Sequence, residues 1–104
     1  MYLYDLSWQD AGQLKHDFRG REIAKQLINC AGSISANMEE AYGRGVGTSD
    51  YRRILRVALG EARETQGWYL RARHILPSET IEHRLDIVNQ IISLLVKAVS
   101  KQVK

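Results

Sequence analysis

The spacing of apolar residues along the chain predicts helices throughout and no strands. Between residues 21 and 42, apolar side chains recur every three or four positions, which places them on one face of an α-helix. This first stripe consists of Ile23, Leu27, Cys30 or Ala31, Ile34, Met38 and Ala41. Valine and isoleucine follow the same helical spacing and not the alternation of a strand, so we expect an all-α protein.

Two further stripes predict helices over residues 49–76 and 79–102. The earlier of these stripes consists of Tyr51, Leu55, Ala58, Ala62, Tyr69, Ala72 and Leu76. The later one alternates four- and three-residue steps, as a bundle or coiled-coil seam does, through Ile81, Leu85, Val88, Ile92, Leu95 and Val99. Pro77 separates the two helices, and we expect Ser78 to cap the last one.

The ends of the second helix and the start of the third carry local signals. Gly43 is expected to end the second helix, because glycine is the usual residue after a helix C-terminus. Thr48 or Ser49 is expected to cap the third helix, with Asp50 in its first turn, where the helix dipole favours an anion.

The pattern at the N-terminus is weaker and predicts a short first helix over residues 4–18. Its apolar positions are Leu3, Leu6, Ala11, Leu14 and Phe18, and Gly20 is expected to separate it from the helix at 21–42. Four helices joined by short loops in 104 residues predict one domain spanning residues 1–104. The expected architecture is an antiparallel up-and-down four-helix bundle with a short first helix.

Composition narrows the class of protein. Hydrophobic residues make up 44% and charged residues 26%, as in an ordinary globular protein. No apolar run approaches the roughly 20 residues that span a membrane, and Asp5 and Asp10 do not fit a signal peptide. Cys30 is the one cysteine, which excludes an intrachain disulfide and is expected to be a core residue. We therefore expect a cytoplasmic protein without membrane contact.

Positive charge is concentrated in the middle of the chain. The net charge is +3, and between residues 44 and 73 only Asp50, Glu61 and Glu64 oppose the arginines. These arginines are Arg44, Arg52, Arg53, Arg56, Arg63, Arg71 and Arg73. The planar guanidinium fork suits phosphate, so this part of the chain indicates nucleic acid or an acidic protein as partner. The alternative is a solvated helix face without a partner.

Part of this charge follows one face of the third helix. We call this face the arginine ridge. Its residues are spaced four or three positions apart and are Arg52, Arg56, Gly60, Arg63, Gly67 and Arg71. Arg44 of the loop and Arg53 at the start of the helix add to three arginines of the ridge. The candidate nucleic-acid-binding residues are therefore Arg44, Arg52, Arg53, Arg56 and Arg63. The alternative is that these side chains pair with Glu61, with Glu64 or with acids of another subunit.

The glycines of the ridge favour a second interpretation. Each glycine inside a helix costs about 1 kcal/mol relative to alanine, so we expect compensation by the close approach of another helix. Gly60, Gly67 and Arg71 are therefore candidate contacts with a subunit or another partner. Trp68 and Tyr69 beside the ridge are core fillers or base-stacking residues.

Catalytic and metal-binding patterns are weak. His16, His74 and His83 lie on different segments, and no Glu-x-x-His pair of the di-iron type is present. The glycine loop at 43–47 lacks the Lys-Ser/Thr of a P-loop and does not follow a strand. The adjacent Glu39 and Glu40 are a poor metal site by themselves. We therefore expect no enzymatic activity, no cofactor and no metal.

The block from Gln26 to Leu59 resembles the bacterial four-helix-bundle family first named for proteins encoded in 23S ribosomal RNA intervening sequences. That family typically carries Gln, then Ser-Ile-x-x-Asn-Ile-Ala-Glu-Gly-x-Gly-Arg, then Ser, an acidic-Tyr/Phe-x-Arg-Phe-Leu segment and Ala-x-Gly-Ser. The matching residues are Gln26, Ser33, Ile34, Asn37, Glu40, Gly43, Arg44, Ser49, Tyr51, Arg53, Leu55, Ala58 and Gly60. The chain departs from the pattern at Ala41 in place of glycine, Ile54 in place of phenylalanine and Glu61 in place of serine.

Three of the matching residues fall on nearly one face of the second helix, namely Ser33, Asn37 and Glu40. Arg44 and Arg53 flank the loop that follows. The simplest physical role for these side chains is a polar network that ties the loop to both helices.

The resemblance implies a four-helix bundle that assembles into ring-like homo-oligomers, often pentamers, without enzymatic activity. One branch of the family is the accessory variability determinant of diversity-generating retroelements, which is basic, binds nucleic acid and associates with a reverse transcriptase. The ribosomal-RNA branch has no settled biochemical role, and the sequence does not choose between the two branches.

We thus predict an oligomeric bundle that binds RNA or DNA through its arginine-rich face. The alternative is a protein–protein scaffold, in which the short first helix leaves part of the bundle groove open for a partner helix or for self-association.

Overall fold

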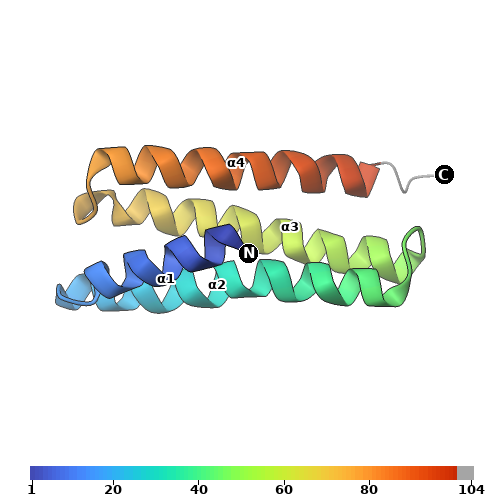
Figure 1. The fold of residues 1–104 in the computed structure, drawn as a ribbon, viewed down its shortest axis with the longest axis horizontal. Coiled ribbons are helices and arrows are strands. Elements are labelled where there is room, and N and C mark those ends of the chain that lie inside the picture. The colour runs from blue at the N-terminus through green and yellow to red at the C-terminus, as the bar shows by residue number, and fades with distance from the viewer. Residues whose placement is uncertain (101–104) are drawn as a thin grey trace.

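The computed structural model describes residues 1–100 as four α-helices and one short 3₁₀ helix, without a strand in that range. Along the chain these elements are α1 (Tyr2–Leu14), α2 (Phe18–Arg44), α3 (Ser49–Arg71), η1 (Ala72–His74) and α4 (Ser78–Ser100). Successive helices run in opposite directions along a body of 47 × 20 × 18 Å (Figure 1). The all-α four-helix bundle with a short first helix is confirmed.

The helices pack in chain order. α2 packs against α1 on one side and α3 on the other, while α4 packs mainly against α3 and meets α1 over a small contact. Figure 1 shows α1 beside the first half of α2, with the N-terminus near the middle of the body's length. The far half of the bundle, where α2 ends and α3 begins, is therefore built from three helices.

The predicted stripes form the core. All seven apolar positions predicted for the third helix are buried. In α4, Ile81, Val88 and Leu95 are buried, whereas Leu85 and Ile92 are half-buried and pack against the core. Cys30 is buried with a free thiol, as its place in the stripe of α2 predicts. Burial raises the pKa of this thiol above its usual value.

The turn between α1 and α2 differs from the prediction. α1 ends at Leu14, and Asp17 caps α2 by accepting a hydrogen bond of 2.8 Å from the Arg19 amide. The first helix thus spans residues 2–14 and not 4–18. Phe18, expected in the core, is the first residue of α2 and is 73% exposed, because the cap turns the chain before it.

Gly20 lies inside α2 and does not separate two helices. A Cβ atom at this position would overlap the backbone carbonyl oxygen of Leu14. Glycine is therefore required here by the close approach of two helix ends and not by a break in the helix, which is why its position in the sequence was misleading.

Other helix ends also differ by a few residues. α2 continues through Gly43 to Arg44 and ends at Gly45, whose φ of 97° is a left-handed conformation that glycine tolerates. α3 ends at Arg71 and not at 76, because the chain tightens into η1 before Pro77. Residues 101–102, predicted as the end of the last helix, lie outside the described residues.

A buried polar cluster fastens α1 to the bundle. Asp10 is 3% exposed and accepts hydrogen bonds from Tyr69 at 2.7 Å and from Arg84 at 2.8 and 3.0 Å. The hydroxyl of Ser7 lies 3.0 Å from that of Tyr69. Burial raises the pKa of the Tyr69 phenol, and the hydrogen bonds to Asp10 raise the pKa of Arg84. The cluster therefore holds a neutral phenol and a charged guanidinium around one carboxylate.

Within residues 1–100, none of the helices combines the length and apolar character that a membrane crossing requires.

Candidate nucleic-acid interface

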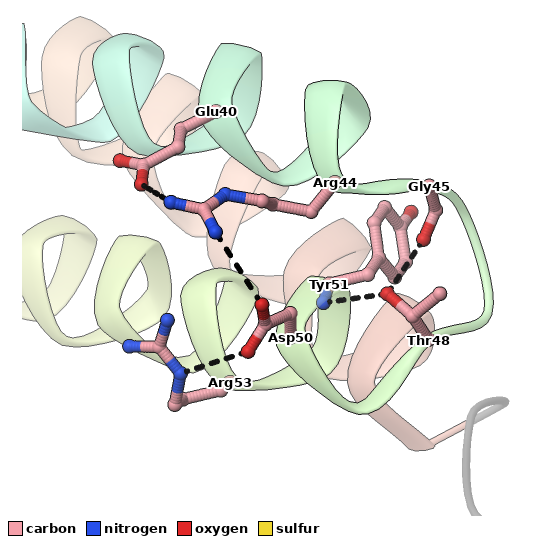
Figure 2. A network of polar contacts seen from close by, with 7 residues as sticks. All are labelled: Glu40, Arg44, Gly45, Thr48, Asp50, Tyr51 and Arg53. Carbon is pink, nitrogen blue, oxygen red and sulfur yellow. Dashed lines mark hydrogen bonds and ion pairs between the residues drawn. The ribbon is translucent and has the colours of Figure 1, made fainter.

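A chain of ion pairs joins the end of α2 to the start of α3 (Figure 2). The Arg44 guanidinium lies 3.2 Å from Glu40 and 3.5 Å from Asp50, and Arg53 lies 3.6 Å from the other oxygen of Asp50. All four side chains are at least half-exposed. Exposed pairs of this kind stabilise a fold by about 0–1 kcal/mol, so both arginines can exchange partners at little cost.

The loop between α2 and α3 is also fixed by a helix cap. The Thr48 hydroxyl accepts a hydrogen bond from the Tyr51 amide at 3.1 Å and donates one to the Gly45 carbonyl at 2.8 Å (Figure 2). Tyr51 is buried and packs edge-on against Tyr42, with ring centroids 5.8 Å apart. Of the two residues predicted to cap this helix, Thr48 does so, and it holds Arg44 and Arg53 on either side of a defined turn.

The predicted loop–helix polar network falls into two parts. The Asn37 amide donates to the carbonyl and the hydroxyl of Ser33, at 2.7 and 3.2 Å, within α2. Glu40 instead belongs to the chain of ion pairs around Arg44. In residues 1–100 no hydrogen bond joins the two parts, so Ser33 and Asn37 act on α2 alone.

The arginine ridge of α3 has few partners of its own. Arg56 and Arg63 are exposed, and among residues 1–100 neither forms an ion pair. Arg52 is half-buried, and its buried Nε atom has no hydrogen-bond partner in the same range. The expected alternative, pairing with Glu61 or Glu64, does not occur between these described residues. The Arg56 and Arg63 guanidinium groups are therefore available to an outside acceptor, whereas the Nε atom of Arg52 is shielded from one.

The C-terminal part of the ridge is hollowed. Its residues enclose a hollow of about 380 Å³ and are Gly60, Arg63, Glu64, Gly67, Trp68 and Arg71. The Arg71 guanidinium lies over the half-buried Trp68 ring, 4.7 Å from its centroid, in a cation–π contact. A Cβ at Gly60 would meet nothing within 4 Å, whereas one at Gly67 would lie 2.9 Å from Arg71. Gly60 thus has no explanation in the packing of its own described chain.

Of the two acidic residues beside the ridge, Glu61 is the less exposed. Glu61 is half-buried, and burial together with the nearby Glu64 raises the pKa of its carboxyl group. The main cause is desolvation, which disfavours the charged form of a carboxyl group.

The Trp68–Arg71 contact was missed in the sequence. The two residues are three positions apart and therefore face each other on a helix, which was the available signal. Tyr69, also considered for base stacking, is fully buried and belongs to the Asp10 cluster. Among residues 1–100, no three histidine, cysteine or acidic side chains gather in a way that could hold a metal ion.

The chain is similar to known proteins of one family. The sequence model of the 23S rRNA-intervening sequence protein family matches residues 8–97. A similar solved structure is that of a protein of unknown function from the S23 ribosomal protein family of Bacteroides thetaiotaomicron. It has a TM-score of 0.69 and 24% identity, over 93% of this chain and 97% of that one, which shows a shared fold. No curated protein matches the chain. On the family match over most of its length, the chain belongs to the 23S rRNA-intervening sequence protein family.

Proposed function

We propose that this protein binds nucleic acid through the arginine ridge and has no catalytic role. The observation that carries the proposal is that Arg52, Arg56 and Arg63 lie on one face of α3 without a carboxylate partner in residues 1–100. Arginines that serve only as a solvated face are commonly paired with acids one turn away, but no acidic residue stands three or four positions from any of these arginines. Phosphate oxygens are the natural acceptors for such a row.

The chain of ion pairs extends this surface to the loop. Arg44 and Arg53 lie at the N-terminal end of α3, where backbone amides and the helix dipole also favour an anion. Their bonds to Glu40 and Asp50 are exposed and weak, so a phosphate can displace the carboxylates. The proposed surface is therefore a strip along α3, with Arg56 and Arg63 at its centre.

The test is the affinity for labelled single-stranded RNA and duplex DNA, measured by fluorescence anisotropy over a series of salt concentrations. Replacing both central arginines, as Arg56→Glu with Arg63→Glu, should weaken binding and lower the slope of log affinity against log salt by about two. A matched control is Arg21→Glu with Lys25→Glu, which makes the same charge change on exposed residues of α2. If the two double variants lost the same affinity for nucleic acid, net charge alone would explain the effect and the proposal would be contradicted.

A second candidate function is a protein–protein scaffold, and Gly60 favours it. A glycine in mid-helix with open space around it costs stability without a benefit inside the described chain. A close contact from another subunit would supply the benefit, with Gly67 and Arg71 beside it in the same hollow. Under this function the chain forms a homo-oligomer, a pentamer by its resemblance to ring-forming bundles.

The Gly60→Ala variant separates the two functions. It should leave nucleic-acid affinity unchanged if the arginines act through phosphates, and it should reduce the oligomer mass if Gly60 lies in a subunit contact. Light scattering coupled to size-exclusion chromatography gives the mass, and a monomeric wild-type chain would exclude the scaffold in its self-associating form.

Association with a reverse transcriptase, as in the retroelement branch, is a further expectation of this proposal and is tested by co-purification with that enzyme.

A further inference from the structure

An open apolar groove lies in the half of the bundle that α1 does not reach. It has a volume of about 440 Å³ and is lined by residues of α2, α3 and α4 together with the first residue. These residues are Met1, Met38, Tyr42, Tyr51, Leu55, Ile91, Leu94, Leu95 and Ala98. On its rims, the Tyr42 and Leu94 side chains are 60% and 66% exposed. The groove is distinct from the arginine ridge, with which it shares no residue.

The sequence of α4 places a second apolar seam along the groove. Beside the core seam, α4 carries a second seam at four-, three- and four-residue steps through Ile87, Ile91, Leu94 and Ala98. Core residues Val88 and Leu95 lie next to it and are covered by the chain itself. A helix with two adjacent apolar seams has two helical neighbours in a bundle. In residues 1–100, α3 is the neighbour for the first seam, and the second is open along the C-terminal half.

The groove continues the interface that α1 already makes. The Tyr4 ring packs on Gly32 of α2, where a Cβ would lie 3.1 Å from it, and Met1 lines the near end of the groove. From Gly32 to Arg44, α2 runs on for about 18 Å, or just over three helical turns. An occupant in line with α1 would therefore cover α2 and α4 in the same way that α1 covers them.

The rims of the groove carry opposite charges. Glu39 on α2 follows the lining residue Met38, and Lys97 on α4 precedes the lining residue Ala98. Both side chains are exposed, and neither forms an ion pair within residues 1–100. A helix in the groove is thus favoured when it has basic residues along one edge and acidic residues along the other.

We propose that the open groove binds an amphipathic α-helix of another polypeptide, which lies in line with α1 and completes the fourth corner of the bundle. The helix presents about three turns of apolar side chains to Met38, Leu55 and Ile91, with a basic edge beside Glu39 and an acidic edge beside Lys97. This is recognition of a helix in a groove, in which apolar anchors supply the affinity and the rim charges supply the selectivity.

The probe is a labelled synthetic helix with leucines at positions i, i+3, i+4, i+7 and i+11, lysines along one edge and glutamates along the other. Two companion peptides carry lysine on both edges or glutamate on both edges. Fluorescence anisotropy with the full chain should show the mixed-edge peptide binding about threefold more tightly than either companion. Leu94→Asp should weaken binding about tenfold or more, because it puts a carboxylate among the anchors.

Charge reversal in the protein should change which peptide is preferred. Glu39→Lys should favour the all-glutamate peptide, and Lys97→Glu the all-lysine peptide. The matched control is Val57→Asp, an exposed apolar residue of α3 that does not line the groove, and it should leave every affinity unchanged. Circular dichroism shows whether each variant retains its helices.

Three results would overturn the proposal. The first is that the mixed-edge peptide does not bind, and the second is that Leu94→Asp binds it as wild type does. The third is a wild-type homo-oligomer that Leu94→Asp converts to monomers, since the occupant would then be a second copy of this chain. Because Arg56 and Arg63 are intact in all these variants, loss of peptide binding leaves nucleic-acid affinity as an independent measurement.

Discussion

Asp10 and Arg84 form a two-point ion pair between the first and last helices. The carboxylate oxygens accept hydrogen bonds from Nε and Nη2 of the guanidinium at 2.8 and 3.0 Å, and the two side chains are 4% and 13% exposed. The pair joins residues 74 positions apart in the sequence. It therefore fixes where α1 lies along α4, which the small apolar contact between these helices does not do alone.

Removing one partner of this pair should be strongly destabilising. Asp10→Ala leaves Arg84 and the Tyr69 hydroxyl without their acceptor in a buried place, and we expect the free energy of unfolding to fall by about 3 kcal/mol. Urea denaturation followed by circular dichroism measures the change. Asp5→Ala, an exposed acid in the same helix, is the control and should have little effect. A similar small loss for both variants would show that the pair is dispensable.

Removing both charges should restore part of the loss. In Asp10→Leu with Arg84→Leu, no uncompensated charge remains, so the double variant should be more stable than Asp10→Leu alone. The comparison by urea denaturation gives the coupling energy of the pair. If the double variant loses as much stability as the two single variants together, the residues do not interact.

Two glycines should respond in opposite directions to alanine. Gly20→Ala places a Cβ against the Leu14 carbonyl and should destabilise the protein by more than 1 kcal/mol, since backbone must move. Gly60→Ala meets open space inside a helix and should stabilise it by about 1 kcal/mol. Thermal unfolding at one fixed pH measures both, and a stabilised Gly20→Ala would contradict the close approach of α1 and α2.

The charged cap of α2 should make the stability of the protein depend on pH in the acidic range. Hydrogen bonds from the Arg19 side chain and amide lower the pKa of Asp17 from 3.8 to about 2. A carboxyl group whose pKa is lowered by folding stabilises the folded state above its unfolded pKa, and this contribution is lost as the pH falls from about 4 to about 2. Asp17→Asn keeps a capping side chain without the charge, so its deficit at pH 7 should shrink over that range. A deficit independent of pH would rule out the carboxylate as its source.

Cys30 should react slowly in the folded protein. Its thiol is buried, and burial raises its pKa, so the reactive thiolate is scarce at neutral pH. A disulfide reagent such as Ellman's should modify it fully in denaturant and far more slowly in buffer. Rapid modification in buffer, with circular dichroism unchanged, would show that α2 and α3 open readily around this residue.

The sequence predicted the elements whose apolar residues repeat over several turns. α3 and the core seam of α4 are long enough for spacing to decide both the type of element and its buried face. Every apolar position predicted for the third helix is buried, although Ala72 and Leu76 lie beyond the end of α3. The open groove was also foreseen from the short first helix. Long amphipathic patterns are informative because burial of a whole stripe outweighs any single residue.

The sequence misled where one residue had two explanations. Gly20 and Phe18 gave the wrong turn between α1 and α2, since a glycine required by close packing and one that ends a helix look the same in a sequence. The Asp10 cluster was missed because its members come from α1, α3 and α4, and no spacing rule joins residues 59 or 74 positions apart. Only the packing of the helices brings them together.

Because α1 is shorter than the other long helices, it holds α4 at one end of the bundle, here called the firm end, and not at the other, here called the loose end. At the firm end, α1 and the Asp10 cluster hold the first turns of α4, so amide protons there should exchange with solvent only when the whole domain unfolds. At the loose end, the C-terminal turns of α4 rest on α3 while one apolar seam faces solvent. Those turns are expected to open in local fluctuations that leave the rest intact, so a partner that covers them would make the whole bundle unfold as one cooperative unit.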